Sequence, residues 1–254
     1  MSNSWEAILF DWDDTLCGAE PHRYTFAQHA AADFGVNLTM AEVYDAFALA
    51  GDSAAGAWGP FIERLPAALG IPVSCQTEFV ERYRHRDLIK AFHLFDDVIA
   101  TFDWLAGLGL RVGIISNNDE AVDRVRELNI ESRVEIIVSP ATFGVGKPDP
   151  RIFTESMALM RVNSTRAIYV GDSFDNDIVG SRAAGLTPVL IDRFGVNPRP
   201  AGYLRVTQLA CLLYTSDAAD ERSRVDLGGR RDITKKKKKI NKISGKREHR
   251  RDTT

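Results

Sequence analysis

Short apolar runs alternate with amphipathic helical patterns along most of this chain, and this alternation restricts the possible folds more than any other feature. A run that is almost entirely apolar is typical of a strand buried on both faces of a parallel sheet. Strands that alternate with helices form an open parallel sheet with helices on both faces. The predicted strands are Ala7–Phe10, Arg111–Ile115, Val134–Val138, Ala167–Val170 and Pro188–Ile191.

The segment 17–92 interrupts this alternation after the first predicted strand. It contains no convincing strand, and its apolar residues recur at helical spacing, as for Phe26, Ala30 and Phe34. We therefore expect an α/β fold in which a Rossmann-like parallel-sheet core carries an inserted domain of α-helices. The expected boundaries are 1–16 and 93–210 for the core, 17–92 for the helical domain and 211–254 for a tail.

Polar side chains follow the predicted strands where each strand ends. Open α/β sheets bind their ligands at the carboxyl ends of the strands, so these side chains are expected to converge on one edge. Each residue taken alone is weak evidence, because Asp, Asn and Ser often cap helices. The converging set contains Asp11, Ser116, Asn117, Asn118, Lys147 and Asp172, with Asp175 and Asp177 close behind.

Clustered carboxylates require a cation or a proton to offset their repulsion. Mg²⁺ is the expected cation because it is hard and prefers oxygen ligands. A carboxylate can attack phosphorus to give an aspartyl-phosphate, and a second carboxyl group can protonate the leaving oxygen and then activate water. A lysine and small hydrogen-bonding groups would hold the phosphoryl oxygens.

Four motifs in the expected order resemble those of the haloacid dehalogenase-like hydrolase superfamily. "DWDDT" matches the D-x-D-x-T motif, "IISNN" the motif ending in Ser or Thr, "GKPDP" the lysine motif and "GDSFDND" the G-D-x-x-x-x-D motif. The resemblance covers about residues 5–209 and implies a phosphatase whose helical insertion is a mobile cap that closes over the substrate.

The resemblance also implies a role for each matching residue. Asp11 is the expected nucleophile and Asp13 the expected general acid and base. The expected phosphoryl-binding residues are Thr15, Ser116, Asn117 and Lys147. The expected Mg²⁺ site contains Asp11, the backbone carbonyl of Asp13, Asp172 and Asp177, with Asp177 supporting the other ligands.

Two positions of the first motif are informative. Asp14 stands where the superfamily usually has Gly, and we interpret it as a turn residue that tolerates positive φ. Its extra negative charge would weaken the affinity for phosphate. Asp13 is present, whereas the dehalogenases of the superfamily lack an acid at this position, so the sequence favours phosphoryl transfer over dehalogenation.

Other functions remain open from the sequence. A phosphomutase would carry the same four motifs, and it differs from a phosphatase in the geometry and timing of the cap. A receiver-type phosphoacceptor module is much shorter and has no helical insertion after its first strand. A catalytically silent phosphate-binding protein would have no reason to retain Asp13. The predicted function is therefore Mg²⁺-dependent hydrolysis of a small phosphorylated metabolite.

Charged residues of the insertion could also reach a substrate, although such residues on a helical domain usually face solvent. Among them, Arg64, Arg84 and Arg86 are predicted to determine substrate preference. The full set is Glu20, His22, Arg23, Arg64, Arg84, His85 and Arg86.

The charge of the chain changes sign near its end. Residues 1–210 carry a net charge of −10, whereas residues 211–254 carry +7 and include five consecutive lysines. "CLLYTSDAADE" and "RVDLGGRR" resemble translated sequencing adapter and primer, and the lysine run resembles translated poly-A, so we expect a non-native, disordered tail. The three cysteines form no disulfide framework and no secretory signal is visible, so we expect a cytoplasmic protein without nucleic-acid or membrane partners.

Overall fold

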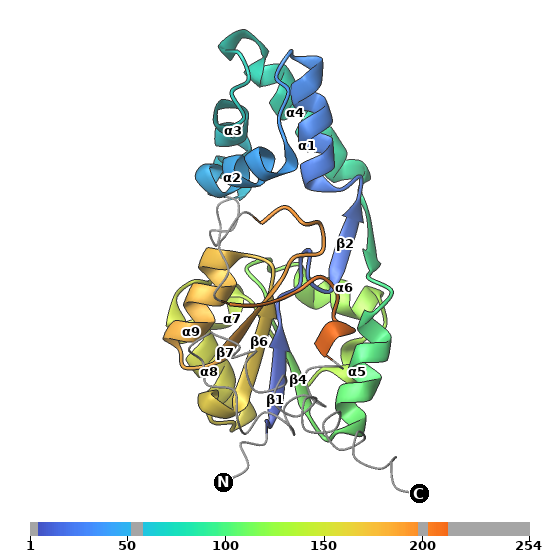
Figure 1. Cartoon of the computed structure of the whole chain (residues 1–254), viewed down its shortest axis with the longest axis vertical. Helices are drawn as coiled ribbons and strands as arrows, with labels where there is room; N and C mark the ends of the chain where they lie inside the picture. The colour runs from blue at the N-terminus through green and yellow to red at the C-terminus, as the bar shows by residue number, and fades with distance from the viewer. Residues whose placement is uncertain (1–4, 52–57, 198–202, 213–254) are drawn as a thin grey trace, which may run out of the picture. The chain divides into compact units, whose positions relative to one another are not determined.

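The core of the protein is a sheet of six parallel strands in the order β5-β4-β1-β6-β7-β8. The structure is a computed structural model, and it describes residues 5–51, 58–197 and 203–212. Figure 1 shows β1 at the centre of this sheet. The predicted α/β fold with a parallel sheet is confirmed. The strands are β1 (Ala7–Phe10), β4 (Arg111–Ile115), β5 (Ile136–Val138), β6 (Ala167–Gly171), β7 (Thr187–Ile191) and β8 (Leu204–Val206).

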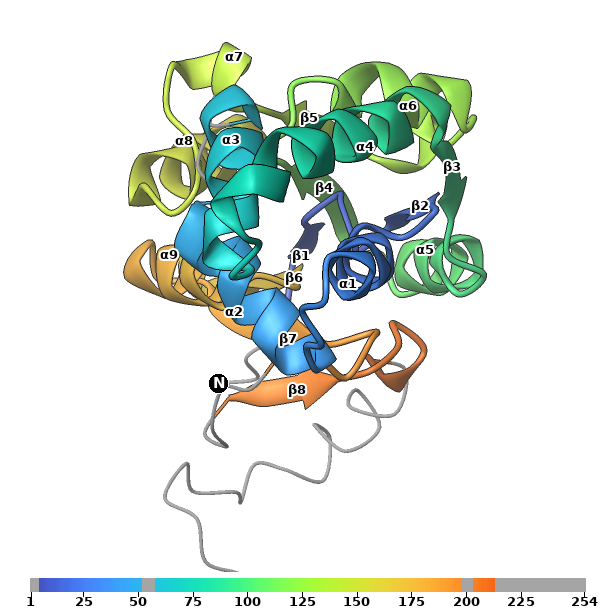
Figure 2. The same ribbon diagram turned by 90° about the horizontal axis from the view of Figure 1, so that it is seen from above.

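Helices cover both faces of the sheet because both faces of the central strands are apolar. Ala7 and Leu9 of β1 belong to one apolar cluster, whereas Ile8 and Phe10 belong to another. Figure 2, in which the sheet is seen from its carboxyl edge, shows α8 and α9 on one side and α5 and α6 on the other. The helices of the core are α5 (Val98–Gly107), α6 (Ala121–Glu127), α7 (Pro140–Phe143), α8 (Pro150–Met160) and α9 (Gly180–Ala183). Short helical turns lie in the connections between helices and strands: η2 (Glu131–Arg133), η3 (Ser164–Arg166) and η4 (Phe174–Val179), the last of which is a π-helix.

The chain order places a crevice beside β1. From β1 the sheet grows through β4 to β5, and on the other side of β1 it grows from β6 to β8. The connections on the two sides cover opposite faces, so the ends of β1 and β6 form the switch point at which open α/β sheets bind ligands. Asp11 and Asp172 directly follow these two strands.

The insertion has its own hydrophobic core. Its helices are α1 (Arg23–Asp33), α2 (Met40–Ala50), α3 (Trp58–Ala68) and α4 (Gln76–Ile89), with the short turn η1 (Val73–Cys75) before α4. Phe47, Phe61, Phe79 and Tyr83 are fully buried or nearly so, and their rings contact one another between these helices. Thr39 and Glu42 form a capping box that fixes the start of α2. We call this helical unit the cap.

The prediction that the insertion contains no strand is wrong. β2 (Cys17–Glu20) and β3 (Ala91–Leu94) pair antiparallel, so the two chain segments that join core and cap lie side by side. This ribbon could not be predicted from the sequence because Gly18, Ala19 and Glu20 have low strand propensity and their partners are distant in the chain. Strand β8 was missed for a related reason, since only Val206 of its three residues is buried.

Only the beginning of the predicted tail lies in the described part of the chain. Leu209 and Leu212 are buried in the core cluster that contains β1 and α5, so the ordered chain extends to at least Leu212. Residues 213–254 lie outside the described residues. No helix of the described residues is long and apolar enough to cross a membrane.

Candidate active site

Three carboxylates follow β1 and lie in different surroundings. Asp11 continues the strand, with its N–H donating to the Val170 carbonyl oxygen at 2.8 Å. Asp13 is partly buried and accepts a hydrogen bond from Asn118 Nδ2 at 3.2 Å. Asp14 has φ 56°, the left-handed conformation expected of a turn residue at this position.

Lys147 connects this loop to the rest of the site. Its ammonium donates to Asp11 Oδ1 at 2.5 Å, to Asp177 Oδ1 at 2.7 Å and to the Tyr169 hydroxyl at 3.2 Å. Burial alone would lower the pKa of Lys147, but the charges of Asp11 and Asp177 outweigh it and raise the pKa. Lys147 therefore stays positively charged beside Asp11, the predicted nucleophile.

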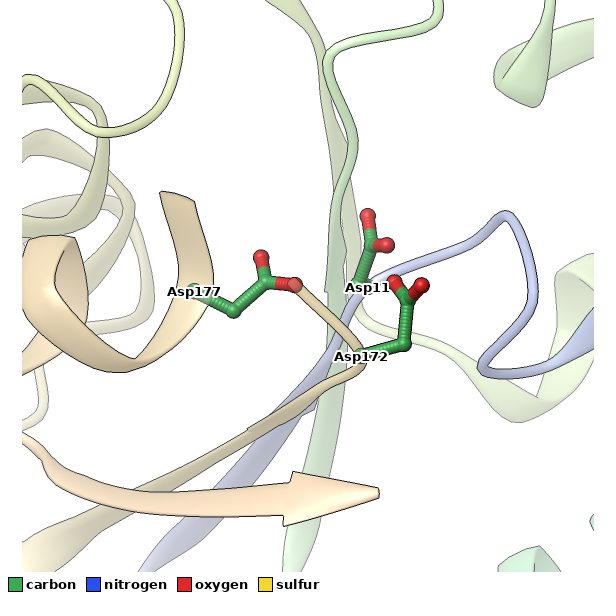
Figure 3. Close-up of side chains that lie close together, drawn as sticks. All are labelled: Asp11, Asp172 and Asp177. Atoms are coloured by element: carbon green, nitrogen blue, oxygen red, sulfur yellow. The ribbon is translucent and has the colours of Figure 1, made fainter. Parts of the chain in front are cut away.

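Asp11, Asp172 and Asp177 form a carboxylate cluster in which one oxygen of each lies within 4.8 Å of the others. Figure 3 shows the Asp11 and Asp172 carboxylates side by side, with that of Asp177 directed toward them. Burial raises the pKa of Asp11 to about 7, with Lys147 opposing the rise and Asp177 and Asp13 adding to it. Burial raises the pKa of Asp172 well above its usual range, and the neighbouring Asp14, Asp11 and Asp177 contribute.

A hard divalent cation fits this cluster. Lys147 supplies one positive charge against three buried or partly buried carboxylates, so a cation that binds oxygen ligands would relieve the remaining repulsion. The oxygens of Asp177 are both engaged, by Lys147 and by the Ser173 N–H at 2.9 Å. Asp11 and Asp172 are therefore the side chains better placed to bind a cation, with Asp177 holding Lys147 and the Ser173 loop.

The loop after β4 closes another side of the site. Ser116 is buried, and its hydroxyl oxygen accepts from the Asn118 N–H at 3.0 Å. Asn117 donates to the Lys147 carbonyl at 2.9 Å and accepts from the Lys147 N–H at 2.7 Å, so its amide fixes the backbone that carries the lysine. Asn118 contacts Asp13; the sequence placed Asn118 in the converging set, but no role was predicted for it.

Thr15 is another of the predicted phosphoryl-binding residues. It is fully buried, its hydroxyl has no hydrogen-bond partner among the described residues, and it does not line the cavity described next. Its carbonyl oxygen accepts from the Arg193 guanidinium at 2.8 and 3.0 Å. Its predicted contact with a phosphoryl group stays a prediction.

The site opens into a cavity of about 400 Å³ lined by both core and cap. Asp11, Asp13, Ser116, Lys147 and Asp172 line it from the core. Seven charged residues of the insertion were predicted from the sequence to be able to reach a substrate. Of these, His22, Arg23 and Arg86 line the cavity. Lys90 and Phe92 were not predicted to reach a substrate, and they line the cavity as well.

Two of the predicted specificity residues point elsewhere. Arg84 is exposed and pairs with Glu63 at 2.5 Å, and neither it nor the exposed Arg64 lines the cavity. The third predicted specificity residue, Arg86, does line the cavity; it is buried and donates to the Pro21 carbonyl oxygen at 2.7 and 2.8 Å. Helical periodicity shows which residues share a face of a helix, but it does not show which face meets the core.

Comparisons with known proteins agree with the fold and the motifs. Glyceraldehyde 3-phosphate phosphatase of Methanopyrus kandleri is 33% identical over 101 residues, which are 39% of this chain and 43% of that protein. The match thus spans less than half the length of that relative.

Solved structures share the fold over most of the chain. A hydrolase of the same superfamily from Deinococcus radiodurans, solved with bound phosphate and sodium, gives a TM-score of 0.63 at 21% identity and covers 86% of this chain and 97% of its own. A 2-haloacid dehalogenase from Pseudomonas syringae gives 0.53 at 20% identity, with 84% and 99% covered. Phosphate-binding and dehalogenating proteins therefore share this fold, and the fold alone does not separate the two chemistries.

The sequence model described as haloacid dehalogenase-like hydrolase matches residues 8–191, which include all four motifs and the cap. This chain belongs to the haloacid dehalogenase-like hydrolase family.

Proposed function

We propose that the protein is a Mg²⁺-dependent phosphatase that hydrolyses a small phosphomonoester through an aspartyl-phosphate on Asp11. The observation that carries the proposal is the placement of two carboxylates with different surroundings at one strand end. Asp11 is held against Lys147, whereas Asp13 faces the cavity and contacts Asn118. A nucleophile and a separate acid and base are what a two-step phosphoryl transfer requires.

In the first step, an Asp11 carboxylate oxygen attacks the phosphorus atom, and the bond from phosphorus to the substrate oxygen breaks. Asp13 gives its proton to that leaving oxygen. Burial raises the pKa of Asp13, although the charge of Arg23 and the Asn118 hydrogen bond oppose the rise, so the protonated form is more available at neutral pH than for an exposed carboxyl. Lys147 stabilises the added negative charge.

In the second step, Asp13 takes a proton from water, and the resulting hydroxide attacks the phosphorus of the aspartyl-phosphate. The bond between phosphorus and Asp11 breaks, which releases inorganic phosphate and restores the Asp11 carboxylate. Mg²⁺, held by Asp11, Asp172 and the Asp13 backbone carbonyl, would neutralise phosphoryl charge. The same Asp13 separates this chemistry from dehalogenation, which needs no acid for its leaving group.

The test is a turnover screen of phosphorylated metabolites, including glyceraldehyde 3-phosphate, with Mg²⁺ and with a chelator. The Asp13→Asn variant, mixed with an aryl phosphate, should accumulate a phosphate adduct on Asp11 that intact-protein and peptide mass spectrometry detect. The aryl leaving group needs little protonation, so the first step continues while hydrolysis slows. Turnover that persists in chelator, or an adduct on another residue, would contradict the proposal. Transfer of the phosphoryl group from Asp11 to a hydroxyl of a sugar phosphate, with no release of inorganic phosphate, would instead indicate a mutase.

A further inference from the structure

The backbone conformation and the burial of Asp14 both cost free energy, and its role as a turn residue does not explain why the charged side chain is kept. It adopts φ 56°, where glycine is the least strained residue, and its carboxylate is buried with 6% of the residue exposed. Two side chains at the start of the cap offset this burial. Arg23 Nε donates to Asp14 Oδ2 at 2.8 Å, and His22 Nε2 donates to Asp14 Oδ1 at 3.2 Å.

The position of Arg23 in α1 does not explain why this residue is an arginine. It is the first residue of α1, and a positive charge in the first turn opposes the helix dipole. His22, the N-cap of α1, makes no side-chain capping hydrogen bond. Helix capping and the helix dipole therefore give no reason for an arginine at this position of α1.

The guanidinium of Arg23 lies at the carboxylate cluster in a fixed orientation. Its Nη2 is 3.9 Å from Asp172 Oδ2 and 3.0 Å from the Tyr24 hydroxyl, and its Cζ lies 4.8 Å from the centre of the Tyr24 ring. Arg23 lines the same cavity as Asp11, Ser116 and Lys147. A phosphoryl group bound in this cavity beside Asp172 would meet the guanidinium, whose planar fork matches phosphate oxygens.

We propose that Arg23 binds the phosphoryl group from the cap side and that Asp14 is the positioning residue that holds Arg23 there. The proposal rests on the proposed phosphatase function and adds a cap residue to the phosphoryl site. It also reverses the expected effect of Asp14 on phosphate affinity, because the anion acts through the arginine that it orients. Burial alone would raise the pKa of Asp14, but the charge of Arg23 and the contact with His22 outweigh it and lower the pKa to about 2, so the carboxylate stays charged at neutral pH.

A simpler role for Arg23 is that it only neutralises Asp14. The two roles differ once Asp14 is replaced by Gly, the usual residue of the family. If Arg23 is only a counter-ion, Arg23→Ala weakens phosphate binding in the native background and has no effect in the Asp14→Gly background. If Arg23 binds phosphate, Arg23→Ala weakens binding in both.

The experiment is calorimetric titration of inorganic phosphate, with Mg²⁺ present, into the wild type, Asp14→Gly, Arg23→Ala and the double variant. Arg23→Ala should raise the dissociation constant of phosphate about tenfold in the native background, the loss of one charge-assisted hydrogen bond. In the Asp14→Gly background, where Asp14 no longer holds the arginine, the effect should be smaller but still more than about twofold. Arg23→Lys should recover only part of this loss, because an ammonium cannot form the planar contact. Arg84→Ala, which removes an exposed cap arginine outside the cavity, is the matched control and should leave the constant unchanged.

Asp14→Gly alone should weaken phosphate binding while the circular dichroism spectrum stays unchanged, since Gly suits φ 56°. Tighter binding in Asp14→Gly would overturn the positioning role of Asp14. A less than twofold effect of Arg23→Ala in the Asp14→Gly background would overturn the role of Arg23. A wild type that binds phosphate would leave the proposed function intact in both cases, whereas a wild type that binds none in Mg²⁺ would overturn the proposed function itself.

Discussion

Lys147 Nζ lies 2.5 Å from Asp11 Oδ1, although 136 positions separate the two residues in the chain. The contact joins the end of β1 to the loop before α8, and Asn117 fixes that loop through both backbone groups of Lys147. Both side chains are almost completely buried. The pair is therefore as much a part of the folded core as of the candidate reaction site.

Replacement of this lysine should destabilise the protein. Lys147→Met leaves Asp11 and Asp177 buried without their cation, which costs about 3–5 kcal/mol of unfolding free energy. The loss should grow as the pH rises, because protonation of Asp11 removes part of the unpaired charge at low pH. Urea unfolding at pH 5.5 and pH 8 measures it. Equal stability of variant and wild type at pH 8 would contradict the buried pairing.

Replacement of the predicted nucleophile should remove turnover and leave the stability of the protein unchanged. Asp11→Asn should lower turnover of an aryl phosphate by about 10⁴-fold or more, as expected when a nucleophile is removed. The metal-free protein should keep its circular dichroism spectrum and its melting temperature, because one like charge leaves the cluster while Lys147 keeps Asp177. Glu63→Gln, at an exposed cap carboxylate, is the isosteric control. Substantial Mg²⁺-dependent turnover in Asp11→Asn would exclude this residue as the nucleophile.

The residues of the site that directly follow strand ends could be predicted from the sequence alone. Asp11, Ser116 and Asp172 could be placed because each follows an apolar run, and runs of this kind are local signals that a parallel sheet aligns at one edge. The motifs then assigned expected roles to the same positions. Nothing in this step required knowledge of contacts between distant segments.

The contacts between core and cap could not be predicted in the same way. The pairing of Asp14 with Arg23 depends on the β2–β3 ribbon, whose strands carry little strand propensity and are joined through the whole cap. Arg64 and Arg84 lie outside the cavity lining, and periodicity could not show this because it does not tell which side of a helical domain faces the sheet. Thr15 illustrates a third limit, since its motif position did not reveal that its side chain lies outside the cavity.

Magnesium should stabilise the protein more at alkaline than at acidic pH. The folded-state pKa of Asp11 is raised from 3.8 to about 7, so its contribution to stability is complete below pH 3.8 and is lost as the pH rises through about 7. Mg²⁺ binds the deprotonated cluster and offsets this loss. The rise in melting temperature caused by Mg²⁺ should therefore be larger at pH 8 than at pH 5, and it should disappear in Asp172→Asn. A shift that is independent of pH would show that Mg²⁺ binds elsewhere.

Substrate preference should respond to the cap residues that line the cavity and not to the exposed arginines. Lys90→Ala and Arg86→Ala should change the ranking of phosphomonoesters, whereas Arg64→Ala and Arg84→Ala should not. Arg86→Ala should also lower the unfolding free energy by about 1.5–3 kcal/mol, because its charge-assisted bonds to the Pro21 carbonyl are lost. Ratios of kcat/KM across a substrate panel, together with urea unfolding, separate the two effects. A changed ranking in Arg84→Ala would mean that the cap closes in another orientation.

The chain end required for stability should lie at Leu212. Leu209 and Leu212 are buried in the core, and the Leu209 N–H donates to Asp97 Oδ2 at 2.7 Å. The same Asp97 carboxylate accepts from Arg193 Nη2 at 2.9 Å, so it links three chain segments and does not cap α5 through its side chain.

A protein that ends at Leu212 should therefore keep its melting temperature and its turnover. One that ends at Gln208 should lose about 4–9 kcal/mol, because burial of each leucine contributes about 1.5–3 kcal/mol and the Asp97 hydrogen bond contributes about 1.5–3 kcal/mol more. Thermal melting and urea unfolding of the three lengths measure the difference. If ending at Leu212 lowered stability by several kcal/mol, residues 213–254 would have to pack on the core, and their resemblance to translated adapter would need another explanation.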